Sequence, residues 1–329
     1  MLALLQQGIV WNDFAVIRIF GDGAGRFVRP EFVGDSLIPF RGVYAALLSP
    51  RARDGELDMA SFRKQVVEVN RSNLRGYAIN GATGEYLIVS DADVDALVRT
   101  ARQEAPDAEI LCGIGAGDVR LTVRRARIAQ LAGANAVLLP MPSFFPYRQD
   151  DLSAYICAVA SSVELPILLY NLPQFTSGLH VDMVLSLFAK HSNIMGIKDS
   201  SGSLDIVRAI TAAGLPHARL IGNDSALPSA LAENVCDGVV SGVACTLPEL
   251  MSSLFATGGQ GNEFGAKRRL LDEFIDRLGP LPTPWGLKVT SAVRRFTHES
   301  YPFPLSSARE IEMTELREWF RGWYKQTLN

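Results

Sequence analysis

Short apolar runs alternate with longer amphipathic stretches from about residue 41 onward, and this is the most regular pattern in the chain. Each run has the length and composition of a buried strand. The eight runs cover residues 42–48, 76–80, 109–113, 136–139, 166–170, 194–198, 219–222 and 238–241. The stretches between them have helical spacing around charged positions, as in Leu121, Arg125, Ile128 and Leu131.

Strands that alternate with helices predict parallel pairing through right-handed crossovers, and eight such units close a (β/α)8, or TIM, barrel. A doubly wound open sheet is the alternative. It usually has a Gly-rich phosphate-binding turn after its first strand, whereas SPRARDG stands here at 49–55. The predicted organisation is an N-terminal extension (1–40), a barrel (41–261) and a C-terminal helical appendage (262–329). FAVIRIF at 14–20 and the glycines after it predict a hairpin in the extension.

Charge and hydropathy exclude several classes of partner. The 329 residues carry a net charge of -3 with a pI of about 5.9 and no basic block, so no nucleic-acid partner is expected. No apolar run reaches the ~18 residues of a membrane span, and the N-terminus lacks the basic region and cleavage site of a signal peptide. We therefore expect a cytoplasmic protein with no membrane partner.

Cysteine and histidine usage predicts neither disulfides nor a metal site. No two cysteines form a CxxC pair, and most lie in strand-like runs, as expected of free thiols in a reducing compartment. The histidines lack ligand spacing, so no metal is expected. The residues are Cys112, Cys157, Cys236, Cys245, His180, His191, His217 and His298.

Lys198 is the first candidate for chemistry, because among the six lysines of the chain it alone lies in an apolar strand, IMGIKDS. Strand alternation puts Ile194, Gly196 and Lys198 on one face. A buried amine favours its neutral form, which can attack a carbonyl to form a Schiff base. The alternative is a strand-end lysine that reaches solvent or pairs with Asp199. The other lysines fall in predicted helices or at their edges, where solvent is available: Lys64, Lys190, Lys267, Lys288 and Lys325.

Tyr170 and the segment GATGE at 81–85 are the next candidates. The same alternation puts Tyr170, at the end of the fifth run, beside Lys198 on the neighbouring strand, where a phenol can pass protons. A core tyrosine bonded to a backbone carbonyl is the commoner alternative. In GATGE, the backbone N–H groups and the Thr83 hydroxyl can hold a carboxylate, or the segment is an ordinary capped turn.

Taken together, these motifs resemble those of the dihydrodipicolinate synthase / N-acetylneuraminate lyase family of class I, pyruvate-dependent aldolases, over roughly residues 41–310. The matching blocks, in order along the chain, are GVYAALLSP with GELD, GATGE, LLYNLP, GIKDSSG, GND and DGVVSGVA. The resemblance implies a barrel that forms a Schiff base with pyruvate or another 2-oxo acid. It also implies a homotetramer built as a dimer of dimers, with no cofactor and no metal.

Site residues follow from the resemblance by position. Lys198 would form the imine, and Tyr170 would shuttle protons. Thr83, between Ala82 and Gly84, would bind the pyruvoyl carboxylate, and the Val240 carbonyl would line the pyruvate pocket.

Three positions depart from the family pattern of a dihydrodipicolinate synthase. Ala82 replaces a relay threonine, and Phe144 replaces a tyrosine that the adjacent subunit supplies. Phe175 stands where the synthases have an arginine, and phenylalanine cannot pair with a carboxylate. These departures indicate a divergent member with a less polar second pocket, and they disfavour 4-hydroxy-tetrahydrodipicolinate synthase activity.

The sequence leaves the second substrate open. Polar residues after the seventh and eighth strands can bind a sugar acid or can simply cap helices: Asn223, Asp224, Ser225 and Ser241. The favoured function is an aldolase or lyase acting on pyruvate or a 2-keto-3-deoxy sugar acid. Dehydration of such a sugar acid through the same imine is one alternative, and a non-catalytic metabolite-binding protein is another.

Overall fold

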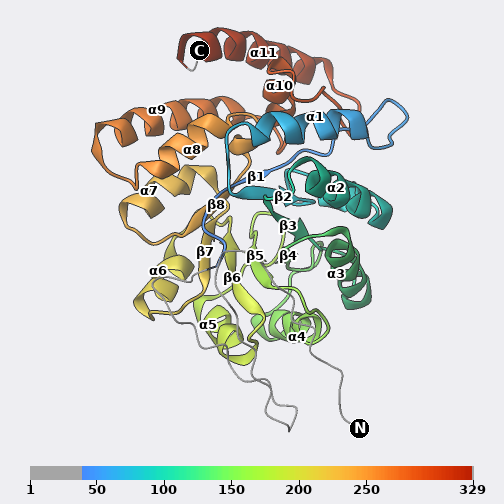
Figure 1. Cartoon of the computed structure of the whole chain (residues 1–329), viewed down its shortest axis with the longest axis vertical. Helices are drawn as coiled ribbons and strands as arrows, with labels where there is room; N and C mark the ends of the chain where they lie inside the picture. Colours follow the sequence, from blue (N-terminus) through green and yellow to red (C-terminus); the bar gives the residue numbers. More distant parts are fainter. Residues whose placement is uncertain (1–38, 328–329) are drawn as a thin grey trace, which may run out of the picture. The chain divides into compact units, whose positions relative to one another are not determined.

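The computed structural model describes residues 39–327, in which eight parallel strands close into a barrel (Figure 1). Each strand pairs with the next in chain order, and the last pairs with the first. The strands are β1 (Gly42–Ala46), β2 (Gly76–Ile79), β3 (Glu109–Gly113), β4 (Ala136–Pro140), β5 (Ile167–Asn171), β6 (Ile194–Asp199), β7 (Ala218–Ile221) and β8 (Gly238–Ser241). The predicted barrel is confirmed, and each predicted run overlaps one strand.

Helices follow the strands around the outside of the barrel, and three more continue after it (Figure 1). The α-helices are α1 (Met59–Asn70), α2 (Asp91–Glu104), α3 (Val119–Ala132), α4 (Gln149–Ala160), α5 (Val181–Lys190), α6 (Asp205–Ala212), α7 (Leu227–Ala232), α8 (Pro248–Ala256), α9 (Gly261–Leu278), α10 (Trp285–Val293) and α11 (Ser307–Thr327). Short 3₁₀ helices are η1 (Tyr86–Ile88), η2 (Asp224–Ala226) and η3 (Val243–Cys245). The predicted C-terminal helices are thus confirmed, whereas the predicted hairpin at 14–20 lies outside the described residues.

Local signals in the sequence explain where several helices begin and end. The side chains of Asp58 and Asp118 accept hydrogen bonds from backbone N–H groups in the first turns of α1 and α3. Ser90 and Asp93 form a reciprocal capping box at the start of α2. Gly133 ends α3 with a φ of 104°, a left-handed conformation that glycine adopts without a steric penalty.

The buried side chains form an inner and an outer layer, because successive strand residues face opposite sides of the sheet. The inner cluster fills the barrel with residues such as Tyr44, Leu111, Leu138, Leu168 and Leu220. The outer cluster packs the sheet against the helices. Tyr170 belongs to the inner cluster. The carboxyl ends of β5 and β6 therefore direct their inward side chains toward the mouth of the barrel, where the active sites of such barrels lie.

Two details of the predicted patterns are wrong. Ile194 packs in the outer layer, and not on the face of Lys198, because the pairing of β5 with β6 shifts register between Ile167 and Leu168. The buried face of α3 consists mainly of small side chains, including Ala126, Ala129 and Ala132. Leu121 and Leu131 are exposed instead, at 39% and 77%.

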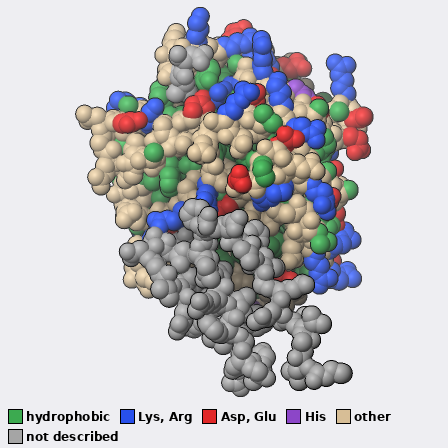
Figure 2. Space-filling model, in the orientation of Figure 1, with side chains coloured by type: hydrophobic (Ala, Val, Ile, Leu, Met, Phe, Trp, Pro, Cys, Tyr) green, Lys and Arg blue, Asp and Glu red, His purple; other side chains and the backbone are tan. Residues whose placement is uncertain are grey.

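The surface shows no dominant charge of one sign on the face seen in Figure 2, where basic and acidic side chains are interspersed. Within residues 39–327, no helix is both long and apolar enough to cross a membrane.

Candidate active site at the mouth of the barrel

Lys198 and Tyr170 lie side by side on adjacent strands, as predicted. The register of β5 and β6 pairs Tyr170 with Lys198, and the Lys198 Nζ lies 4.0 Å from the centroid of the Tyr170 ring. Both side chains are almost fully buried, at 3% and 2% exposure. Lys198 therefore does not reach bulk solvent. Its amine is held beside the Tyr170 phenol in a poorly hydrated place.

Asp199 does not form an ion pair with Lys198 in the described structure. Its Oδ1 accepts hydrogen bonds from the Asn171 side chain, at 3.0 Å, and from the Ser201 N–H, at 2.9 Å. Burial raises the pKa of the Asp199 carboxyl group. The Asp199 carboxyl group, which follows Lys198 directly in the sequence, is therefore bound by other hydrogen-bond donors and not by the Lys198 amine.

Gly222, directly after β7, leaves the space that the Lys198 side chain occupies. A Cβ atom at this position would lie 2.8 Å from the Lys198 Cε and 2.1 Å from the Ser200 Oγ. Both distances are shorter than non-bonded contacts allow. A side chain at position 222 would thus displace the amine.

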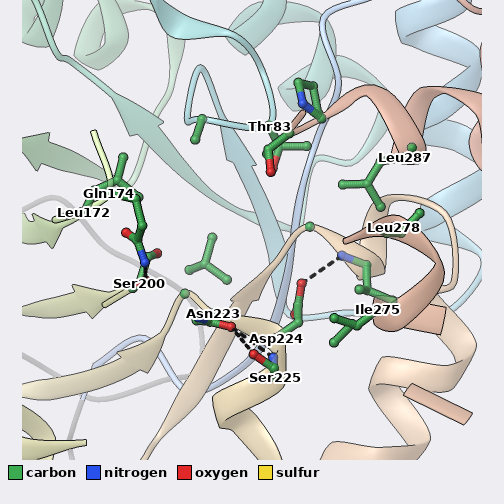
Figure 3. A pocket seen from close by; sticks show the side chains of 18 of the residues that line it. Thr83, Leu172, Gln174, Ser200, Asn223, Asp224, Ser225, Ile275, Leu278 and Leu287 are labelled. Carbon is green, nitrogen blue, oxygen red and sulfur yellow. Dashed lines mark hydrogen bonds between the residues drawn. The ribbon is translucent and has the colours of Figure 1, made fainter. Parts of the chain in front are cut away.

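Lys198 and Tyr170 both line a cavity of about 340 Å³, and Figure 3 shows other residues around it. Several residues singled out in the sequence line it with Lys198 and Tyr170: Ala82, Thr83, Phe175, Asp224 and Val240. Its volume lies at the lower end of the range of roughly 300–1,000 Å³ found for small-molecule sites.

Thr83 lies in a tight turn after β2, and its hydroxyl and the Asp224 carboxyl group both approach Gly242. The point at which Gly242 would carry a Cβ lies 3.5 Å from the Thr83 Oγ1 and 3.6 Å from the Asp224 Oδ2. Gly84 does not line the cavity. A Cβ on Gly84 would lie 3.2 Å from the Asn80 N and 3.3 Å from the Leu47 carbonyl oxygen, so this glycine allows the turn to pack closely on β1 and β2.

The same turn is tied to the C-terminal region by a buried ion pair. Glu85 adopts a left-handed φ of 54°, and its Oε2 lies 2.6 Å from the Nζ of Lys288 in α10. The Lys288 amine also donates to the Ser300 carbonyl at 2.6 Å. Lys288 is 3% exposed, so its predicted access to solvent is wrong: tertiary packing buries an otherwise ordinary helical lysine. Burial lowers the pKa of Lys288, and Glu85 opposes this effect.

The end of β7 supplies the polar edge of the cavity. The Asn223 Oδ1 accepts hydrogen bonds from the N–H and the hydroxyl of Ser225, at 3.1 and 2.6 Å. The Asp224 Oδ2 accepts from the Val243 N–H at 3.1 Å, whereas its buried Oδ1 has no partner. Burial raises the pKa of the Asp224 carboxyl group. Ser241 lies below this edge and does not line the cavity; its Oγ accepts from the Ala244 N–H at 2.9 Å.

The two phenylalanines predicted for a second pocket lie in different places in the structure. Phe175 lines the cavity and is 58% exposed. Phe144 does not line it. It is 89% exposed, has a left-handed φ of 81°, and packs edge-on against Phe145. Within one described chain the two rings do not line a common pocket, and a contribution of Phe144 to the site of an adjacent subunit stays a prediction.

Sequence reasoning missed one whole wall of the cavity. The segment 275–287 contributes Ile275, Leu278, Leu281 and Leu287, and Figure 3 shows three of these opposite Leu172, Gln174 and Ser200. Nothing in the helical pattern of the C-terminal region indicates which part of it covers the barrel mouth.

No group of three or more His, Cys, Asp or Glu within residues 39–327 is arranged to hold a metal ion. The four cysteines are free. Burial raises the pKa of Cys112 and Cys236 to about 12, so these thiols stay protonated and unreactive at neutral pH.

A model of the dihydrodipicolinate synthetase family matches residues 39–318. This chain belongs to that family. A 4-hydroxy-tetrahydrodipicolinate synthase of Exiguobacterium sibiricum is 30% identical over 246 residues, which cover 74% of this chain and 83% of the relative.

Solved structures of the family have the same fold. The dihydrodipicolinate synthase of Aquifex aeolicus superposes with a TM-score of 0.81 at 21% identity, covering 88% of this chain and 100% of the other. The Acinetobacter baumannii enzyme, complexed with pyruvate, gives 0.76 at 26% identity (87% and 98%). An N-acetylneuraminate lyase from Mycoplasma synoviae gives 0.76 at 18% identity (88% and 98%). Family membership makes the chain an enzyme, a lyase of the class I aldolase type.

Proposed function

We propose that this enzyme forms a Schiff base between Lys198 and pyruvate, and makes or breaks a carbon–carbon bond to it. The observation that carries the proposal is the buried Lys198 amine, 4.0 Å from the Tyr170 ring and open to a cavity of about 340 Å³. A relative of the same fold is complexed with pyruvate, which supports this 2-oxo acid as the shared half of the substrate.

In the synthetic direction, the Lys198 Nζ attacks C2 of the 2-oxo acid, and the carbonyl oxygen leaves as water. The Tyr170 phenol is the nearby group that can donate and recover the protons this step requires. Loss of a C3 proton from the imine gives an enamine, whose C3 attacks the carbonyl carbon of an aldehyde. The aldehyde oxygen takes up a proton, and water then releases a 4-hydroxy-2-oxo acid and the free amine. Cleavage is the reverse sequence.

The turn that contains Thr83 is the proposed binding site for the 2-oxo acid carboxylate. Thr83 is nearly buried and lines the cavity with Lys198, so a carboxylate there meets a hydroxyl donor in a place where competing water is scarce. The Val240 carbonyl, on β8 beside this turn, is proposed to line the opposite side of the pyruvoyl group.

Borohydride trapping tests the proposal. Addition of pyruvate followed by reduction is expected to increase the intact mass by one reduced pyruvate, and the Lys198→Ala variant is expected to gain nothing. Tyr170→Phe is expected to form the adduct much more slowly. No adduct on the wild type, or an equal adduct on Lys198→Ala, would refute the imine.

Dehydration of a 2-keto-3-deoxy sugar acid remains the second candidate, because the Asp224 Oδ1 lacks a partner and can accept from a substrate hydroxyl. It begins from the same imine, so product analysis distinguishes it: a dehydratase releases water and keeps the carbon chain intact, whereas an aldolase releases pyruvate and an aldehyde. Formation of the adduct without turnover of either class of substrate would contradict both proposed reactions.

We further propose a homotetramer in the cytoplasm. Three exposed apolar side chains follow the ends of β2 and β4: Leu87, Phe144 and Phe145. Phe144 packs against Phe145, and an exposed apolar cluster of this kind supports contact with another subunit. Light scattering coupled to size-exclusion chromatography measures the assembly directly.

A further inference from the structure

We infer that the aldehyde partner of the proposed aldolase reaction is neutral and mainly apolar, such as an aromatic or branched aliphatic aldehyde. This inference rests on the proposed function and concerns the part of the cavity beyond Lys198 and Thr83. Three features of that region carry it: its charge, its apolar wall and the hydrogen bonds already made along its polar edge.

The cavity offers no cation to a second acid. Among its lining residues in the described chain, Lys198 and Asp224 are the only charged ones. Lys198 is consumed by the imine, and Asp224 would repel a carboxylate. Phe175, which projects into the same space, cannot form an ion pair. An aldehyde that carries its own carboxylate would therefore be buried without a partner, which is strongly unfavourable.

One wall is formed by the segment 275–287, which contributes nine lining residues, none of them charged, with Thr283 as the only polar side chain. Ile275, Leu278 and Leu281 are partly exposed and line the cavity with the buried Leu287, and Figure 3 shows Ile275, Leu278 and Leu287 together on one side of it. Covering partly exposed apolar side chains with an apolar ligand removes them from water, which favours binding. A polyhydroxylated ligand would gain nothing from this wall.

Part of the polar edge is engaged within the protein. The Asn223 oxygen accepts two hydrogen bonds from Ser225, and the Gln174 amide donates to the Ser200 carbonyl at 2.8 Å. The buried side-chain atoms left without a partner here are the Asp224 Oδ1 and the Ser200 Oγ. They can accept a hydroxyl group, as the C4 hydroxyl of an aldol product requires.

Aldol addition to pyruvate with three aldehydes tests this inference: benzaldehyde, glyceraldehyde and succinic semialdehyde. We expect kcat/KM for benzaldehyde to exceed that for either of the others by about ten-fold or more, the discrimination typical of a pocket that matches or mismatches a substrate group. Phe175→Arg is expected to lower activity with benzaldehyde and raise it with succinic semialdehyde.

Matched variants distinguish the effect of the apolar lining residues on aldehyde preference from general effects of substitution. Phe175→Ala and Leu281→Asn are expected to reduce the preference for benzaldehyde, whereas Phe303→Ala and Leu131→Asn, at residues that are 68% and 77% exposed and outside the cavity, are expected to leave it unchanged. Each variant is first checked for the pyruvate adduct.

The outcomes distinguish the two proposals. Absence of the adduct on the wild type contradicts the imine itself. A normal adduct with preference for glyceraldehyde or succinic semialdehyde overturns the apolar partner alone. A normal adduct with no aldehyde converted overturns the apolar partner and also contradicts the proposed carbon–carbon chemistry. An unchanged preference in both Phe175→Ala and Leu281→Asn also overturns it.

Discussion

Replacing the buried Lys288 tests whether α10 holds the Thr83 turn in place. The Lys288 amine contacts the Glu85 carboxylate and the Ser300 carbonyl, each at 2.6 Å, and the two side chains of the ion pair are 3% and 12% exposed. Lys288→Met keeps most of the apolar stem but removes both interactions. It leaves the Glu85 carboxylate partly buried without its partner.

The expected loss of stability follows from this burial. Removing one partner of a buried ion pair costs about 3–5 kcal/mol. Because Glu85 retains some contact with water, we expect the lower end, about 3 kcal/mol. At about 2–4 °C per kcal/mol for a large domain, the melting temperature should fall by about 6–12 °C. The KM for pyruvate should also rise, since Glu85 and Thr83 share one turn.

Urea unfolding and thermal melts measure the effect, with Lys190→Met as the matched control. Lys190 is an exposed helical lysine, so its replacement should change the free energy of unfolding by no more than about 0.5 kcal/mol. Adding Glu85→Gln to Lys288→Met removes the uncompensated charge and should restore part of the loss. A free energy of unfolding for Lys288→Met within about 1 kcal/mol of the wild type would refute the reasoning.

Three further predictions concern the cavity and its surroundings. Gly222→Ala should fold but form the pyruvate adduct at least about ten-fold more slowly, because its Cβ would displace the Lys198 side chain; an unchanged trapping rate, with folding verified by circular dichroism, would contradict this. Asp224→Asn should raise the free energy of unfolding at neutral pH. Burial raises the pKa of this carboxyl group in the folded state, so the ionised carboxylate destabilises the fold as the pH rises through the raised pKa. The gain in stability from Asn should therefore shrink toward acidic pH. An equal gain at pH 5 and pH 8 in urea titrations would contradict this prediction. Phe144→Ser should weaken subunit association in light-scattering measurements while leaving the monomer fold intact, since the ring is 89% exposed; an unchanged assembly would remove Phe144 from the interface.

The sequence by itself determined the barrel and the central pair of the site. Strand and helix periods are local properties, so eight alternating units predict the topology before any contact is known. In a parallel barrel, sequential strands are neighbours and side chains alternate, which is enough to bring Tyr170 beside Lys198. The one failure on this strand, Ile194, came from a register shift that alternation alone does not predict.

Tertiary structure decided everything that depends on segments far apart in the chain. Lys288 and Glu85 are separated by 203 residues, and only the packing of α10 on the barrel mouth turns an apparently exposed lysine into a buried ion pair. The same packing sets residues 275–287 over the cavity, whereas the loops after β5 and β4 place Phe175 inside it and Phe144 outside it. The residues proposed to form the imine are thus specified by local periodicity. The wall proposed to select its partner depends on how distant helices pack, because contacts across loops carry no periodic signal in the sequence.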